Sequence, residues 1–225
     1  MLSLAALVAM AIPPPIELPT TMLAARASTY PPCKPTDFSC VTAVKVKVPT
    51  PLPLEALVRV NVSSVNPSDV DLEKSLGKLW GTLGVDFAGE VVSKGPLCSN
   101  LEVGDMVWGT TVGAYAEYTT VICPITGKLK GSDPQALGTL AEVGTTSAEA
   151  LQKAGAPWRA SDNFTVVITS GSGGTGFVAI QLAKAYGART VVTAVGGQAN
   201  AAFVKSLGAD VVVDYHESDA YSPST

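Results

Sequence analysis

The sequence predicts an α/β fold in which a β-rich, barrel-like domain is followed by a doubly wound parallel sheet. Two observations predict this class. From about residue 40 to 125, short β-branched runs are separated by Pro and Gly, a pattern typical of small all-β domains. From residue 164, apolar runs of strand length alternate with helical segments, as in βαβ units. We therefore expect domains at 26–132 and 133–225, with 1–25 as an N-terminal extension or presequence.

The composition is that of a folded chain with a real core. Hydrophobic residues make up 47% of the 225 residues and charged residues 15%, which disfavours disorder over most of the length. The net charge is −4, without any basic run. Because phosphate binding requires clustered Lys and Arg, we do not expect nucleic acid as a partner.

The N-terminal residues 1–11 are apolar and end in Ala-Met-Ala, which resembles a signal-peptide cleavage pattern. They lack a positive flank, and the run is far shorter than the ~20 residues of a membrane span. We interpret them as a presequence, or as residues preceding an alternative start at Met22. A working targeting signal is the alternative. We expect no membrane span and a cytoplasmic protein.

The first strands are expected at 41–49, 55–67, 86–95, 104–109 and 115–122. Within the second of them, apolar and other residues alternate, which is the period of a half-buried strand.

A helical pattern covers 133–155. Asp133 is expected as its N-cap and Pro134 as its first residue, with breaks at Gly138 and Gly144.

The rest of the chain alternates between strands and helices. The expected elements are strands at 164–169, 190–195 and 210–215 and helices at 175–186 and 198–207. The strands are predicted to be parallel, in the order 3-2-1, and buried on both faces. This is the first half of a doubly wound sheet, and 216–225 is a polar tail, so we expect a C-terminally truncated chain.

The turn after the first of these strands has the pattern Gly171-x-Gly173-x-x-Gly176. Between a strand and a helix, glycines allow a tight turn and close approach to a pyrophosphate, while the helix N-terminus favours its charge. We predict a dinucleotide site here. The alternative is a glycine-rich connector without a ligand.

The end of the second strand, 194–198, carries no carboxylate. An NAD site places Asp or Glu there to bond the ribose hydroxyls, so the sequence favours NADP(H). The alternative is that neither cofactor is strongly preferred, because the same stretch holds no Arg or Lys.

The four cysteines, at 33, 40, 98 and 123, show no CxxC pair and no metal-ligand spacing. We expect reduced thiols in an intracellular protein, with a disulfide or metal site as the alternative. The single histidine, His216, makes a histidine-built zinc site hard to assemble.

Eight stretches together resemble the medium-chain dehydrogenase/reductase superfamily, in its zinc-independent quinone oxidoreductase (zeta-crystallin-like) branch. They are VNPSDV (65–70), GVDFAGEVVSKG (84–95), VGDMVWG (103–109), GAYAEY (113–118), GTTSAEAL (144–151), SGSGGTG (170–176), AIQLAKAYGA (179–188) and LGADVVVDY (207–215). The resemblance implies a GroES-like β-rich barrel domain and an incomplete Rossmann domain.

The resemblance also implies that no metal is bound. In the zinc-dependent members of the superfamily, a Cys and a His-Glu pair lie near the catalytic zinc. Here Asn66 stands at the Cys position and Val85-Asp86 replaces His-Glu. Zinc needs thiolate or imidazole ligands in a convergent set. Asp86 and Glu90 are therefore interpreted as structural.

The site residues implied by the resemblance form four groups. Asn66 would position the nicotinamide and the substrate, and Thr146 would contact the nicotinamide side. The pyrophosphate turn would comprise Ser170, Gly171, Gly173, Gly174, Thr175 and Gly176. The 2′-phosphate end would comprise Gly196, Gly197 and Asn200, with Tyr215 near the adenosine. Taken alone, Asn66 fits a turn before Pro67, Thr146 a helix cap and Tyr215 a surface residue.

The implied activity is transfer of a hydride from NADPH to a quinone or an α,β-unsaturated carbonyl without zinc, as in an enoyl reductase. The proton donor is not assigned. The alternative is a non-catalytic dinucleotide-binding remnant or an inactive fragment of the same family. A homodimer is compatible with the resemblance if the chain is complete.

Overall fold

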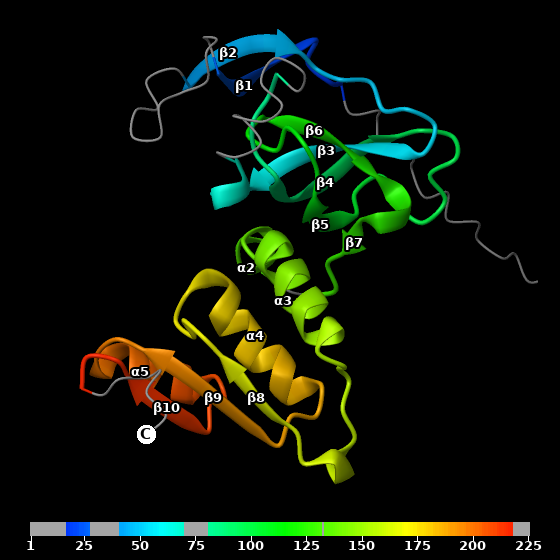
Figure 1. The fold of residues 1–225 in the computed structure, drawn as a ribbon. Coiled ribbons are helices and arrows are strands. Elements are labelled where there is room, and N and C mark those ends of the chain that lie inside the picture. The colour runs from blue at the N-terminus through cyan, green and yellow to red at the C-terminus, as the bar shows by residue number, and fades with distance from the viewer. Residues whose placement is uncertain (1–16, 28–40, 70–80, 132, 218–225) are drawn as a thin grey trace, which may run out of the picture.

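The computed structural model describes residues 17–27, 41–69, 81–131 and 133–217. Figure 1 shows two halves, each with its own β-strands, and helices α2 and α3 lying between them. The N-terminal half holds antiparallel strands and the C-terminal half holds parallel strands. The predicted order of a β-rich part followed by an α/β part is therefore confirmed.

The N-terminal half contains two sheets. One is a pair, β1–β2, and the other has five strands in the order β6-β3-β4-β5-β7. The strands are β1 (Thr21–Ala27), β2 (Val41–Lys47), β3 (Glu55–Val62), β4 (Asp86–Lys94), β5 (Met106–Thr110), β6 (Tyr118–Ile122) and β7 (Gly127–Lys128). All five strands expected here are present. Strands β1 and β7 were not predicted, and β1 begins inside the segment 1–25 that was expected to be an extension.

The five-stranded sheet is buried on both faces where β1 and β2 cover it. Val58, Phe87 and Val107 belong to a core cluster on one face, and Leu57 packs with Met22 on the other. The alternation in β3 predicts one buried face. Leu57 is nonetheless fully buried, because the β1–β2 pair supplies a second apolar layer.

Helices α2 (Pro134–Gly138) and α3 (Ala141–Lys153) connect the two sheets. The side chain of Asp133 accepts the backbone N–H of Gln135 and caps α2 as predicted. The expected break at Gly144 is wrong, because α3 runs through it. Within the described ranges, no helix is long and apolar enough to cross a membrane.

The C-terminal half is a βαβαβ unit. It consists of β8 (Thr165–Ile168), α4 (Gly174–Ala185), β9 (Thr190–Val195), α5 (Gln198–Ser206) and β10 (Val211–Asp214). The strands pair in parallel in the order β10-β9-β8. This confirms the predicted 3-2-1 order.

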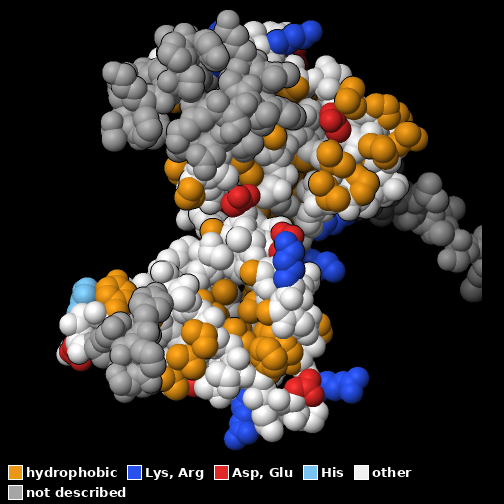
Figure 2. All heavy atoms as spheres, in the orientation of Figure 1, with side chains coloured by type: hydrophobic (Ala, Val, Ile, Leu, Met, Phe, Trp, Pro, Cys, Tyr) orange, Lys and Arg blue, Asp and Glu red, His pale blue; other side chains and the backbone are white. Residues whose placement is uncertain are grey.

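Burial on both faces was predicted for all three strands, and this is wrong for β8 and for β10, in which Val211 is 46% exposed and no residue is fully buried. Val166 and Ile168 pack against Ile180 and Ala183 of α4. Val167, between them, is 70% exposed. Its side chain lies on the opposite face of the strand, because successive side chains of a strand alternate. Figure 2 shows apolar atoms gathered over α4 and β8 in the lower half of the molecule.

The prediction of reduced thiols is wrong for two of the four cysteines. Cys98 and Cys123 form a disulfide, with their Cα atoms 5.6 Å apart, and both are buried in the core of the N-terminal half. The loop after β4 folds back on the residues before β3 through a bond from the Leu97 N–H to the Pro53 carbonyl. This return brings together two cysteines 25 residues apart, a pairing that local spacing cannot reveal. Cys33 and Cys40 lie outside the described residues.

We expect the double substitution Cys98→Ala/Cys123→Ala to lower the free energy of unfolding by about 3 kcal/mol, because a loop of this length loses its constraint in the unfolded chain. Urea unfolding of both proteins measures the difference. Thiol titration of the denatured, unreduced wild type provides the check. Four free thiols, or equal unfolding free energies, would contradict the assigned pair.

Candidate cofactor-binding site

The glycine-rich turn joins the carboxyl end of β8 to the first residue of α4. Ser170 adopts a positive φ of 54°. Its carbonyl accepts the N–H of Gly173 at 2.9 Å, and the N–H of Gly171 reaches the carbonyl of Ala194 in β9 at 3.3 Å. The turn is therefore fixed by backbone bonds, both within itself and to the neighbouring strand.

The four glycines of this turn have two different reasons to lack a side chain. A Cβ on Gly171 would overlap the side chain of Thr193, and a Cβ on Gly176 would overlap the carbonyl of Ser170. These two positions are constrained by the fold itself. Gly173 and Gly174 are exposed, and the nearest described atoms would lie 3.3 Å and 3.4 Å from their Cβ positions. Their surroundings leave room for an external group.

Helix α4 begins at Gly174 with Gly173 as N-cap, and no side chain caps it. The first N–H groups of a helix have no partner within the helix, and they carry the positive end of its dipole. Thr175 is exposed in this first turn. A helix start with these features, next to exposed glycines, can hold a phosphate group.

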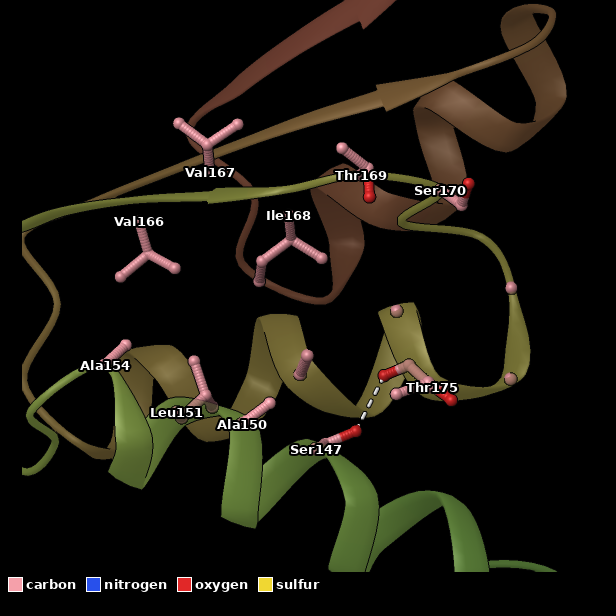
Figure 3. A pocket seen from close by; sticks show the side chains of 14 residues that line it. Ser147, Ala150, Leu151, Ala154, Val166, Val167, Ile168, Thr169, Ser170 and Thr175 are labelled. Atoms are coloured by element: carbon pink, nitrogen blue, oxygen red, sulfur yellow. Dashed lines mark hydrogen bonds between the residues drawn. The ribbon is translucent and has the colours of Figure 1, made fainter.

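Ser147 of α3, which was not predicted as a site residue, holds the other side of the turn in place. It is fully buried, and its hydroxyl lies 2.7 Å from the carbonyl of Val143 and 2.8 Å from that of Thr175. Figure 3 shows this contact beside a cavity between α3, β8 and α4. The cavity has a volume of about 570 Å³. Small buried hydroxyls in helices carry no sequence signal, so periodicity alone could not single out Ser147.

The residues predicted for the 2′-phosphate end come together at the carboxyl end of β9. Gly197, with φ of 83°, is the N-cap of α5. The Asn200 amide donates to the Gly196 carbonyl at 2.8 Å. The ring of Tyr215 packs over Gly196, whose added Cβ would lie 2.6 Å from the Tyr215 hydroxyl.

Asp214 also belongs to this group, although it was not predicted as a site residue. Both of its carboxylate oxygens lie 3.0 Å from the N–H of Gly197. The backbone N–H groups of Gly197 and His216 hold the pKa of the Asp214 carboxyl below its ordinary value. No carboxylate follows β9 in sequence, yet the structure brings one there from the end of β10.

Asn66 lies in the other half, in a buried polar cluster. Its Nδ2 donates to Asp86 Oδ2 at 2.9 Å and to Ser64 Oγ at 3.1 Å. Asp86, at the start of β4, is fully buried. Its other oxygen accepts the N–H of Glu142 in α3 at 2.8 Å. Asp86 therefore links Asn66 to the helix that contacts the glycine turn.

Asp69 and Tyr115 extend this cluster. The Tyr115 hydroxyl donates to Asp69 Oδ2 at 2.7 Å, and the same oxygen accepts the backbone N–H of Asn66. Burial is the main cause that raises the pKa of the Tyr115 hydroxyl above its ordinary value, and the hydrogen bond to Asp69 raises it further. Tyr115 therefore stays protonated and fixes the loop that carries Asn66.

The predicted site residues thus fall into three places. The glycine turn and the Gly196–Tyr215 group share the carboxyl end of the parallel sheet, and Asn66 belongs to the antiparallel half. Thr146 is exposed on α3, next to the buried Ser147. In the part of the chain that the structure describes, no group of three or more His, Cys, Asp or Glu side chains could hold a metal ion.

An antiparallel β half joined to a parallel half with a glycine-rich turn is the architecture of two-domain, nucleotide-dependent dehydrogenases and reductases. Two family profiles match this chain, and they follow the same order as the antiparallel and parallel halves. "Alcohol dehydrogenase GroES-like domain" matches residues 52–156, and "Zinc-binding dehydrogenase" matches residues 174–223. The chain belongs to the medium-chain dehydrogenase/reductase superfamily, and within it resembles the quinone oxidoreductases.

Three known proteins illustrate this similarity. A chloroplastic quinone-oxidoreductase homolog of Spinacia oleracea is 33% identical, over 80% of this chain and 58% of its own length. A 2-methylene-furan-3-one reductase of Solanum lycopersicum is 32% identical, over 89% and 54%. A mycobacterial protein solved in complex with NADPH is 27% identical with a TM-score of 0.73, over 88% and 60%. The chain spans little more than half the length of these relatives.

Proposed function

We propose that this chain binds NADP(H) and serves an oxidoreductase that reduces a quinone or an α,β-unsaturated carbonyl. The glycine turn is the observation that carries the proposal. It combines two exposed glycines with the uncapped start of α4. Backbone N–H groups and a helix dipole at one point are suited to a pyrophosphate. A mycobacterial relative solved in complex with NADPH supports the same cofactor.

The residues present fit such a cofactor. Gly173, Gly174 and the N–H groups of the first turn of α4 would hold the pyrophosphate. Gly196, Gly197, Asn200 and Tyr215 would receive the adenosine and its 2′-phosphate. Asn66 and Thr146 would act at the nicotinamide end. When bound, NADPH supplies the hydride, and the chain holds and orients the reactants.

The names of two relatives support the class of acceptor. One is described as a quinone-oxidoreductase homolog and the other as a 2-methylene-furan-3-one reductase. Quinones and enones are electron-poor already, so they accept hydride without a metal to polarise them.

We further propose that the reaction is independent of zinc, although one matching profile is named for it. At the position where zinc-dependent members carry a cysteine ligand, the NH₂ group of Asn66 points at Asp86. Position 66 therefore offers neither the thiolate nor the imidazole that zinc prefers. Cys98 and Cys123 are joined in a disulfide and cannot act as thiolates.

NADPH oxidation followed at 340 nm, with a panel of benzoquinones, naphthoquinones and enones, tests the activity. We expect acceptor-dependent consumption of NADPH that is unchanged by a zinc chelator. NADPH binding without turnover on any acceptor would favour the non-catalytic alternative. Loss of activity after chelation, restored by zinc, would contradict the zinc-independent reaction.

Asp214→Asn tests the position of the 2′-phosphate. The substitution keeps an acceptor for the Gly197 N–H and removes the negative charge. If the 2′-phosphate lies beside Gly197, repulsion falls and the ratio of NADPH to NADH affinity rises, by about fivefold for two charges separated in a solvated site. Titrations with both cofactors measure the ratio. An unchanged ratio would place the phosphate elsewhere.

A further inference from the structure

The amide of Asn66 has a defined orientation. Asn66 is 6% exposed and Asp86 is fully buried. The Ser64 hydroxyl donates its hydrogen to Asp86 Oδ2 at 2.5 Å, so Ser64 Oγ can only accept from Asn66. A carboxylate also accepts only. Both neighbours therefore require the NH₂ end of Asn66, and a flipped amide would set its carbonyl oxygen against two acceptors.

This orientation determines what Asn66 can offer to a ligand. Its Nδ2 donates to Ser64 and Asp86, whose two acceptor oxygens lie only 2.5 Å apart, so a single N–H can serve both. Within the described residues, no donor contacts its Oδ1. Asn66 therefore offers Oδ1 as an acceptor, at the end of the amide that faces away from Asp86. A nicotinamide riboside carries hydroxyl and amide N–H donors, which match this acceptor.

Asp86 also fixes the helix that borders the glycine turn. The N-cap residue of α3, Leu140, makes no side-chain cap bond. Asp86 Oδ1 instead accepts the N–H of Glu142 at 2.8 Å, so the cap of α3 comes from strand β4. The three donors on Asp86 explain how its carboxylate can be fully buried. They also tie the orientation of Asn66 to the position of α3.

We propose that Asp86 is a positioning residue that holds Asn66 as a hydrogen-bond acceptor for the nicotinamide-riboside end of the cofactor. Asn66 then contacts the cofactor through Oδ1. This inference rests on the proposed function and narrows the role of Asn66 within it. It also gives Asp86, which was predicted to be structural only, a part in the site.

Asp86→Asn tests the proposal. The new amide can cap Glu142 with its oxygen, and its NH₂ then faces Asn66. Asn66 must rotate to offer Oδ1 to it, and its own NH₂ turns toward the ligand. We expect NADPH binding to weaken about tenfold, the typical effect of replacing one good hydrogen bond by a mismatch. Binding of 2′-phosphoadenosine 5′-diphosphate, which lacks the nicotinamide riboside, should not change.

Two further variants make the test specific. Glu90→Gln makes the same chemical change on the same strand, at an exposed ion pair with Arg59, and should leave both affinities unchanged. Ser64→Ala keeps the Asp86 carboxylate and removes the second acceptor. It should weaken NADPH binding about threefold. This variant tests the same hydrogen-bond network if Asp86→Asn does not fold.

A double-mutant cycle with Asn66→Ala separates positioning from general damage. If Asp86 acts through Asn66, Asp86→Asn adds little to the loss already caused by Asn66→Ala. The side-chain NH₂ signals of Asn66 in ¹⁵N NMR give a readout without cofactor. We expect slow exchange with solvent in the wild type and fast exchange in Asp86→Asn.

Additive effects, equal losses of NADPH and 2′-phosphoadenosine 5′-diphosphate, or unchanged NH₂ signals would each overturn the positioning role. These results would leave cofactor binding intact. A wild-type chain that binds neither ligand would overturn the proposed function as well, so the two failures are distinguishable.

Discussion

Gly176→Val should lower the free energy of unfolding by about 3 kcal/mol or more. The Cβ would overlap the carbonyl of Ser170 and lie 2.9 Å from the Gly171 Cα. Both obstacles are backbone atoms of a turn held to β9, so the clash is relieved only by opening the turn. Overpacking typically costs about 1–3 kcal/mol, and a backbone obstacle belongs at the upper end of that range.

Urea unfolding measures this loss, and Gly144→Val is the matched control. Gly144 lies inside α3, where an added Cβ meets nothing within 4 Å. In a helix, Val is slightly more favourable than Gly, so the control should be equal to the wild type or better by about 0.5 kcal/mol. Equal stabilities of Gly176→Val and wild type would mean that the turn does not have the described geometry.

Gly173→Val should have the opposite profile, with cofactor binding lost and stability retained. Gly173 is exposed and has a φ of −76°, which any residue can adopt. Its Cβ would meet one described atom, the Ser170 carbonyl oxygen, at 3.3 Å. A bound pyrophosphate would lie where the valine methyl groups project. We expect NADPH affinity to fall tenfold to a hundredfold, the equivalent of about 1–3 kcal/mol of overlap.

Calorimetric titration and thermal unfolding of the same preparation measure both effects. The smaller Gly173→Ala should fall between Gly173→Val and the wild type in affinity. If Gly173→Val is folded and binds NADPH as the wild type does, the turn is only a connector.

Local sequence patterns predicted the parallel half well. The alternation of apolar runs and helices, with Gly171, Gly173 and Gly176 between the first strand and helix, was enough to predict the strand order. Asp133 was recognised as an N-cap because its signal lies within three residues. These features depend on neighbours in the chain, which the sequence displays directly.

The features that were missed depend on contacts between distant segments. Cys98 meets Cys123 because a loop returns, and Asp214 reaches Gly197 because β10 lies beside β9. Leu57 is buried because β1 and β2 cover a face that the alternation marks as exposed. Val167 is exposed because, in the described structure, no element covers its face of β8. Helix α4 covers the opposite face.

For the polar cluster around Asn66, the residue was predicted from the sequence and the orientation of its amide was not. The resemblance singled out Asn66 and noted Asp86 as a replacement for a glutamate. The orientation of the amide requires the bonds of Ser64 and Asp86 to be known, and Ser64 has no distinguishing pattern in the sequence. The identity of residue 66 was enough to predict a site there. Which end of its amide faces Asp86 can be known only from the structure.

The most direct test of the central claim is a calorimetric titration of NADPH and NADH into the wild-type chain. We expect saturable binding of one NADPH per chain, with NADH binding more weakly and 2′-phosphoadenosine 5′-diphosphate competing for the same site. Absence of heat and of competition at millimolar NADPH, with the protein shown to be folded, would contradict the claim that this glycine turn holds a dinucleotide.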